Sequence, residues 1–323
     1  MGKFNKGILL LTLFAIVVGC GGSGTEQTGT PGSMFVGGTE GLSVAFAPGS
    51  LPETVMDQDQ SFAVSLVVQN RGDHSIENGA DIKASITGID PADFGVSAGD
   101  LEQSPDTGIR GAQKDTTGAT VSGETISLDF PKSGNFAHQK TIAGSVQYNV
   151  RADVCYKYGS VANTKLCILE DMLGTQGTEG KLCQINEEKV IDKSGAPVTV
   201  TSFRESVSSA NKVAFVFKVE HVGTGKVHKL ASGCLADFAN KDKVRVKIDT
   251  GISDGLTCSG LQDGAASGST YEGEATLLNG AREIRCTQTV NNPTDIEKLV
   301  RIDLSYDYKQ YIQQTMTVQH VGG

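Results

Sequence analysis

Short runs of alternating apolar and polar residues recur along most of this chain. In the run VAFVFKVE (213–220) the odd-numbered residues are all large and apolar: Val213, Phe215, Phe217 and Val219. Similar runs include LSVAFA, DIKASITG and ETISLDF in the first half and VTVTSF, KVRVKID and AREIRCTQTV in the second. A period of two is that of a β-strand, and Gly, Asn and Asp turns separate the runs. Helical periodicity is scarce, so the pattern predicts an all-β protein.

The strand pattern occurs twice. FAVSLVVQNRGDHSI (62–76) aligns with VAFVFKVEHVGTGKV (213–227), and DVCYKY (153–158) aligns with DLSYDY (303–308) at almost the same offset. Two matches in the same order indicate an internal repeat. We therefore expect two tandem β-sandwich domains, residues 39–169 and 196–323, joined by a polar connector over 170–195. A single barrel is less favoured, because each repeat is long enough for a complete sandwich.

The N-terminus has the order of a secretory signal. Lys3 and Lys6 precede an apolar run over 8–18, which is too short to span a bilayer. The residues VVGC (17–20) resemble the lipobox of prokaryotic lipoproteins, in which the cysteine is lipidated. An ordinary signal peptide with an incidental cysteine is the alternative. We expect a lipoprotein signal peptide over 1–19 and lipid on Cys20.

A polar segment rich in Gly, Ser and Thr follows the cysteine. Such a segment buries too little apolar area to offset its ordering entropy. We expect 20–38 to be a lipidated flexible tether that holds the folded part clear of the membrane. The protein would then be exported and anchored to the outer face of a cell membrane, with that membrane as a partner.

Six further cysteines make an even set, which in an exported chain predicts three disulfides. Cys155 and Cys167 flank GSVANT, a plausible hairpin turn, and their equivalents in the second repeat are both absent. We expect the pairs Cys155–Cys167, Cys258–Cys286 and Cys183–Cys234. The chief alternative joins Cys167 to Cys183, and the sequence alone leaves fifteen connectivities open.

The alternating apolar residues followed by Asn-x-Gly in residues 62–76 resemble the CARDB-type immunoglobulin-like domains of prokaryotic surface proteins. Together with the lipobox and the CYKY…C segment, they make the chain similar to archaeal cell-surface lipoproteins. His221 stands where the first repeat has Asn70. The resemblance implies tandem immunoglobulin-like sandwiches in a display, adhesion or envelope-assembly protein, and it transfers no catalytic residue.

Charge and motifs narrow the possible functions. The net charge of −9 disfavours nucleic acid as a partner. GxSxG and HExxH motifs are absent from the sequence, so we expect no enzyme activity, no catalytic residue and no cofactor. Candidate partners are an envelope protein, a glycan or a second copy of the chain. A solute- or glycan-binding role serving a transporter or an envelope enzyme is the alternative function.

Several residue groups suggest chemistry but have a simpler structural interpretation. Arg71–Asp73 form an RGD tripeptide, whose glycine aligns with Gly223 and is expected to serve turn geometry. His221 and His228 flank a glycine turn, yet two imidazoles make a weak metal site. Carboxylates that could help to hold Ca²⁺, although loops are favoured, are Asp57, Asp59, Asp90 and Asp93. The tyrosines that gather on the last strands, where packing is favoured, are Tyr148, Tyr156, Tyr158, Tyr306, Tyr308 and Tyr311.

Overall fold

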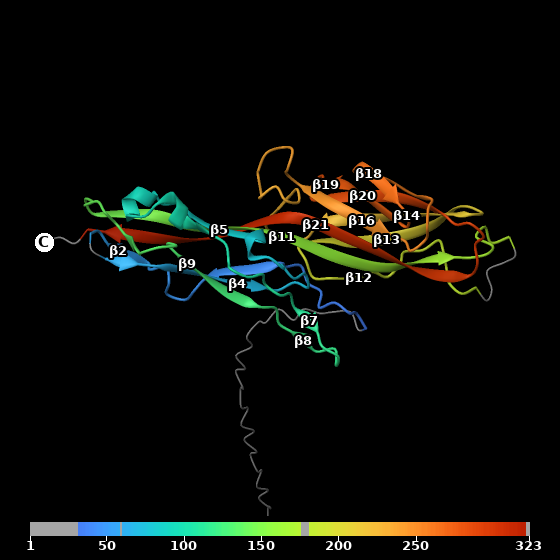
Figure 1. The fold of residues 1–323 in the computed structure, drawn as a ribbon, viewed down its shortest axis with the longest axis horizontal. Helices are drawn as coiled ribbons and strands as arrows, with labels where there is room; N and C mark the ends of the chain where they lie inside the picture. Colours follow the sequence, from blue (N-terminus) through green and yellow to red (C-terminus); the bar gives the residue numbers. More distant parts are fainter. Residues whose placement is uncertain (1–31, 59, 176–180, 321–323) are drawn as a thin grey trace, which may run out of the picture.

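The computed structural model describes residues 32–58, 60–175 and 181–320, and it confirms an all-β protein (Figure 1). Within these ranges the helices are three short 3₁₀ segments: η1 (Gly79–Asp81), η2 (Pro91–Phe94) and η3 (Ala98–Leu101). The predicted signal peptide (1–19), Cys20 and the first part of the tether lie outside the described residues. No helix in the described ranges is long and apolar enough to cross a membrane.

Two strands of 24 residues each run side by side through the molecule: β11 (Ser145–Ile168) and β21 (Ile296–Gln319). They are antiparallel and pair without interruption from Ser145 opposite Gln319 to Ile168 opposite Ile296. At about 3.4 Å per residue, this ribbon is roughly 80 Å long. The last strands of the two repeats are therefore joined to each other along their whole length, and the two halves share one sheet.

Within the described residues, that shared sheet has ten strands. Its main path is β18 (Gln262–Ser267), β19 (Thr270–Thr276), β16 (Lys243–Asp249), β21, β11, β5 (Ile82–Thr87) and β6 (Glu102–Gln103). Three short strands pair off this path: β12 (Asp192–Lys193) with β11, and β2 (Thr54–Met56) and β15 (Lys226–His228) with β21. Among the strands that the structure describes in this sheet, only β2 pairs in parallel.

Four smaller sheets complete the described fold, and no sheet closes on itself there. The first contains β1 (Leu42–Phe46), β4 (Val64–Asn70) and β9 (Thr125–Phe130). The second contains β13 (Val198–Ser209), β14 (Lys212–His221), β20 (Ala281–Thr289) and β17 (Leu256–Ser259). The remaining pairs are β3 (Ser61–Phe62) with β10 (Phe136–Ala137), and β7 (Gln113–Lys114) with β8 (Thr120–Val121).

Four buried tyrosines lie at the centre of the ribbon on one face. Tyr156 is opposite Tyr308 and Tyr158 is opposite Tyr306, and cross-strand partners share a face of a sheet. The hydroxyls of Tyr156 and Tyr306 accept hydrogen bonds from the amides of Leu42 in β1 and Val198 in β13. The sheet that contains β1 and the sheet that contains β13 therefore cover the same face of the ribbon. The expected packing of these four tyrosines is confirmed.

The two repeats make equivalent contacts with this tyrosine cluster. Tyr158 donates to Oδ1 of Asn70 at 2.9 Å, and its equivalent Tyr308 lies 3.0 Å from Nε2 of His221. A Cβ added to Gly72 would lie 2.3 Å from the Tyr158 hydroxyl, and one added to Gly223 would lie 2.4 Å from that of Tyr308. The aligned glycines thus permit a close approach of a tyrosine, whereas we had expected them to serve turn geometry.

The connector and the end of the tether are both packed against the sheets. The amide of Lys189 donates to Phe203 and that of Glu205 donates to Glu187, so the connector covers the outer edge of β13. Upstream, Val36 is buried and its amide donates to Asp73 at 2.7 Å. The expected tether of 20–38 therefore does not extend to residue 38, because its last residues are bound to the folded part.

Candidate functional site

The described residues contain three disulfides: Cys155–Cys234, Cys167–Cys183 and Cys258–Cys286. The expected Cys258–Cys286 pair is confirmed, and these two residues are direct cross-strand partners. The expected Cys155–Cys167 and Cys183–Cys234 pairs are wrong. The alternative that joined Cys167 to Cys183 is the pairing observed.

The Cys155–Cys167 prediction fails because GSVANT is not a turn. Both cysteines lie on the continuous strand β11, which at about 3.4 Å per residue separates them by roughly 40 Å. Cα atoms more than about 7 Å apart cannot be bridged. Three disulfides nevertheless mark an exported or extracellular protein, since such bonds persist in oxidising compartments.

The Cys155–Cys234 disulfide holds the loop between β15 and β16 against the ribbon. Beside it, the buried carboxylate of Asp307 accepts hydrogen bonds from the amides of Ala231 and Gly233 at 2.9 and 2.8 Å. Nδ1 of His228, in turn, lies 2.9 Å from the carbonyl oxygen of Leu235. We call residues 229–242 the clasped loop. A covalent bond and several hydrogen bonds fix its backbone.

The clasped loop carries the most exposed apolar side chain among the described residues. Phe238 is 98% exposed and Leu235 is 57% exposed. Burying a phenyl ring contributes about 2–3 kcal/mol, so a rigid loop that leaves one in water is suited to a contact surface. In Figure 1 the loop projects beyond the sheets, on the opposite side from the first described residues in dark blue.

An open cleft of about 440 Å³ lies beside this loop. Lys229 of the loop and Arg245 of β16 line it together with Glu272 and Glu274 of β19. Four of its charged side chains are paired, because Arg245 contacts Glu272 and Lys229 lies 3.2 Å from Glu274, and Asp263 adds a fifth charge. The cleft therefore offers hydrogen-bonding groups without a large net charge.

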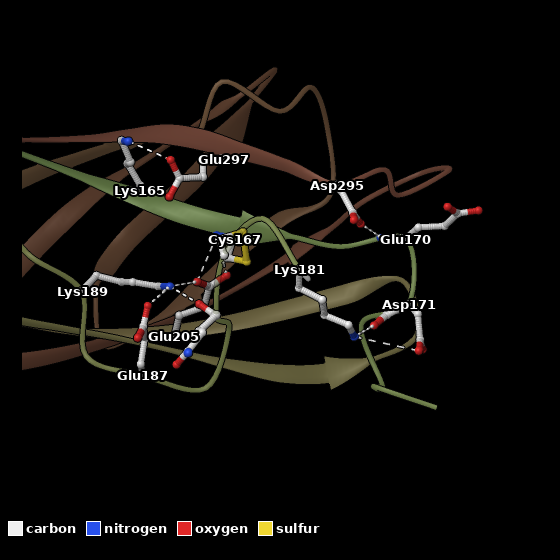
Figure 2. Close-up of a disulfide and its surroundings, with 12 residues drawn as sticks. Lys165, Cys167, Glu170, Asp171, Lys181, Glu187, Lys189, Glu205, Asp295 and Glu297 are labelled. Carbon is white, nitrogen blue, oxygen red and sulfur yellow. Dashed lines mark hydrogen bonds and ion pairs between the residues drawn. A yellow bond between two sulfur atoms is a disulfide. The ribbon is translucent and has the colours of Figure 1, made fainter. Parts of the chain in front are cut away.

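A second cluster surrounds the Cys167–Cys183 disulfide at the far end of β11 (Figure 2). Glu205 of β13 has no exposed surface, and its two carboxylate oxygens lie 3.1 and 3.0 Å from the amide nitrogen of Cys167. Lys189 of the connector lies 3.2 Å from Glu205 and also donates to Glu187 at 2.7 Å. Burial raises the pKa of Glu205 to about 7, although the Cys167 amide and Lys189 act in the opposite direction.

The RGD tripeptide is part of the packing of the N-terminal segment. The carboxylate of Asp73 accepts hydrogen bonds from the amides of Val36, Gly37 and Gly195 at 2.7, 3.2 and 2.5 Å. These backbone hydrogen bonds occupy the carboxylate that a receptor would need.

The candidate histidines and aspartates that the structure describes contact different residues. His221 contacts Tyr308 on the buried face, whereas His228 is opposite Asp307 on the other face of the ribbon. Asp57 contacts His320 at 2.8 Å, Asp90 caps η2, and Asp93 forms an ion pair with Lys140. Asp59 lies outside the described residues. Of the remaining tyrosines, Tyr148 packs on Phe94, and Tyr311 is half exposed under the guanidinium of Arg151.

Sequence reasoning missed both Glu205 and Phe238. Glu205 had a usable signal, because it lies two residues after the buried Phe203, on the inward side of an alternating strand. An acidic residue at an apolar position of a strand indicates a buried charge with a partner. Phe238 had no such signal, since its neighbours ADFAN show no periodicity.

No family model matches this sequence, and no curated protein matches it. Among solved structures, the secreted serine protease VesC from Vibrio cholerae is similar at a TM-score of 0.18 and 10% identity. The match covers 87% of this chain and 52% of that one, so the chain spans about half the length of that protease. A TM-score this low does not indicate a shared fold.

Proposed function

We propose that this protein is a lipid-anchored cell-surface protein that displays a binding surface and has no catalytic role. The observation that carries the proposal is the rigid clasped loop with Phe238 fully exposed at its surface. A long, disulfide-held ribbon supports that loop, and the chain enters the fold on the opposite side in Figure 1. Exposed aromatic side chains on preordered loops are frequent contact residues for proteins, because little entropy is lost on binding.

The anchor is the part of this proposal that rests on the sequence. Cys20, after a short apolar segment, would carry lipid, and the residues from 21 to about 32 would form the tether. As a flexible coil, twelve residues span about 20 Å. The display face would stand beyond that distance, because the clasped loop lies across the body of the molecule from the first described residues, drawn in dark blue in Figure 1.

The same order of strand pairing occurs in both halves of the chain. In each half a first strand pairs with a second, and the second pairs with a later one: β1-β4-β9 in the first half and β13-β14-β20 in the second. Each of these sheets covers one half of the ribbon through its tyrosines. We infer that residues 39–169 and 196–323 are immunoglobulin-like sandwiches fused through their last strands.

Two experiments test the display function. Replacing Cys20 with Ser should release the protein from membranes into the medium, and retention in the detergent phase would contradict the anchor. The unlipidated chain should then be screened against envelope proteins, glycans and itself. Phe238→Ser should reduce any specific binding at least tenfold, whereas Leu299→Ser, which removes a 61% exposed leucine from β21, should not. Hydrolysis of an envelope polymer by the purified chain would overturn the non-enzymatic role.

A glycan-binding role is the second candidate, and the cleft beside the clasped loop favours it. Arg245 and Glu272 provide paired hydrogen-bonding groups of the kind that recognise hydroxyls. If a glycan is the ligand, the double variant Arg245→Ala with Glu272→Ala should abolish binding. Phe238→Ser should then have a smaller effect than this double variant, which separates the two candidates.

A further inference from the structure

Five neighbouring positions on one face of the β11–β21 ribbon carry only amide or hydroxyl side chains. Gln147 is directly opposite Thr317, Asn149 is directly opposite Thr315, and Gln313 lies next to Thr315 on the same side of β21. Thr317 is half-buried, and the other four residues are exposed. We call these five residues the neutral face.

The reverse side of the same stretch belongs to the core. Val150 and Met316 are buried there, and the ring of Tyr148 packs on Phe94 of η2 with 5.1 Å between the centroids. Successive side chains of a strand point to opposite faces of its sheet. The neutral face is therefore the solvent side of a packed sheet, at the end of the ribbon nearest the C-terminus marked in Figure 1.

The fold does not impose uncharged residues on this face. In the repeat alignment at an offset of 150, Glu297 is the equivalent of Gln147, and Lys165 is the equivalent of Thr315. Lys165 and Glu297 form an ion pair at 2.7 Å on the same face of the ribbon, at its opposite end. Exposed positions of these strands thus accept charged side chains, and the neutral face differs from its own equivalent in chemistry.

The neutral face offers hydrogen-bond donors and acceptors together. The Thr315 hydroxyl donates to Oδ1 of Asn149 at 3.1 Å, which leaves Nδ2 of Asn149 as a donor and the Thr315 oxygen as an acceptor. A charged group loses its hydration at a cost when an uncharged ligand covers it, whereas amides and hydroxyls exchange water for equivalent hydrogen bonds. Such a surface suits a ligand that consists mainly of hydroxyl groups.

An aromatic ring lies at one end of the neutral face. Tyr311 is two residues before Gln313 on the same side of β21, and it is 53% exposed. The guanidinium of Arg151 lies 3.8 Å from the centroid of this ring and is itself paired with the buried carboxylate of Asp153. A tyrosine with an exposed ring can pack on the apolar C–H groups of a sugar while its hydroxyl stays in water.

We propose that the neutral face and Tyr311 form a binding platform for a neutral polysaccharide chain. The amides and hydroxyls bind the sugar hydroxyls, and the tyrosine ring packs against one sugar ring. From Thr317 to Tyr311 the platform is about 20 Å long, at about 3.4 Å per residue, which suits an extended polymer. It includes no residue of the clasped loop or of the cleft beside that loop, so this inference is independent of the proposed function.

The test is adsorption of the unlipidated full chain to insoluble cellulose, chitin and curdlan, measured as the fraction of protein removed by sedimentation. We expect adsorption to at least one of these neutral polymers. Adsorption should persist in about 1 M NaCl, where the Debye length is about 3 Å, because the contact involves no ion pair. Absence of adsorption to all three polymers, or its loss at high salt, would overturn the proposal.

Two double variants locate the contact. Gln147→Ala with Gln313→Ala should lower the partition constant about tenfold, because two hydrogen-bonding side chains are lost. The matched control is Lys165→Ala with Glu297→Ala, which removes two exposed side chains from the same face at the other end of the ribbon. This control should adsorb like the parent. Both double variants should melt like the parent, since all four positions are exposed. Equal adsorption by both double variants would contradict the platform.

Tyr311 separates ring packing from hydrogen bonding. Tyr311→Phe should keep the adsorption, and Tyr311→Ser should weaken it several-fold, because the phenyl ring is the contacting group. An equal loss in both variants would contradict ring packing. Adsorption to the platform is a separate activity from binding at the clasped loop, so Phe238→Ser should leave it unchanged. The two surfaces can therefore fail independently, and an equal loss of adsorption in Phe238→Ser would overturn the assignment to the neutral face.

Discussion

Lys157 lies directly opposite Asp307 in the β11–β21 ribbon, and the two residues occupy equivalent positions in the two repeats. A position that faces its own equivalent marks an approximate two-fold axis, as in the self-complementary interface of a symmetric dimer. The two charged residues at the axis have different contacts, since Lys157 contacts Asp81 and Asp307 binds the clasped loop. The chain therefore combines a dimer-like scaffold with one asymmetric surface loop.

Replacing Gly72 or Gly223 with Ala should destabilise the fold. The new methyl group would overlap the hydroxyl of Tyr158 or Tyr308, and overpacking of this kind costs about 1–3 kcal/mol. Chemical denaturation would measure the loss. Gly99→Ala is the matched control, because its Cβ would meet only Ser97 at 3.8 Å. A loss in the control equal to that at Gly72 would contradict the close-approach explanation.

His221 should make stability depend on pH. Burial lowers its pKa below the ordinary value near 6.5, so the unfolded chain binds a proton before the folded one does. The resulting stability is complete above about pH 6.5 and is lost as the pH falls. His221→Asn, which copies Asn70 of the first repeat, should remove this contribution. Equal pH dependence of melting in both proteins would show that the imidazole does not contribute.

Glu205 should make stability depend on pH in the opposite direction, so that its contribution falls as the pH rises. Its pKa is raised from 4.5 to about 7 in the folded state, so the folded protein keeps a proton that the unfolded chain has lost. Its contribution is greatest below about pH 4.5 and declines as the pH rises to 7, by about 3 kcal/mol in total. Compared with the parent, Glu205→Gln should therefore gain relative stability across that interval. The difference between their urea midpoints, measured against pH, checks the sign.

Removing the Cys155–Cys234 disulfide should release the clasped loop. The double Ser variant is expected to lose about 2–4 kcal/mol of stability and to become sensitive to protease within residues 229–242. The matched double variant at Cys258 and Cys286 should leave that loop resistant, because its bond joins two neighbouring strands. Early cleavage of the loop in both variants would mean that Asp307 and the disulfide do not hold it.

The local strand pattern, the repeat and the burial of the central tyrosines could be predicted from the sequence, because period-two alternation directly reflects one buried face. The long ribbon could not. Gly159 made GSVANT resemble a turn, but in the fold its missing Cβ lets His74 and the backbone of Leu304 come close. The partner of β11 also lies in the other repeat, and no local signal identifies a strand about 150 residues away.

The candidate sites likewise include features that could be predicted from the sequence and features that could not. Cys258–Cys286 could be predicted because the two residues bracket one local excursion of the chain, and they are direct partners across β17 and β20. Cys155–Cys234 could not, since it depends on how the second half folds over the ribbon. Glu205 was visible in the pattern as a polar interruption, but its neighbour Cys167 becomes apparent only when β11 and β13 are placed together.

The pairing of β11 with β21 also determines when the protein can finish folding. Some contacts of the first half require the C-terminal segment. Gln310 donates to Leu42 across 268 residues, and His320 contacts Asp57 across 263. A chain that is synthesised from its N-terminus makes these partners last. The first half thus stays incomplete until nearly the whole polypeptide has been made, and the C-terminal strand completes the fold.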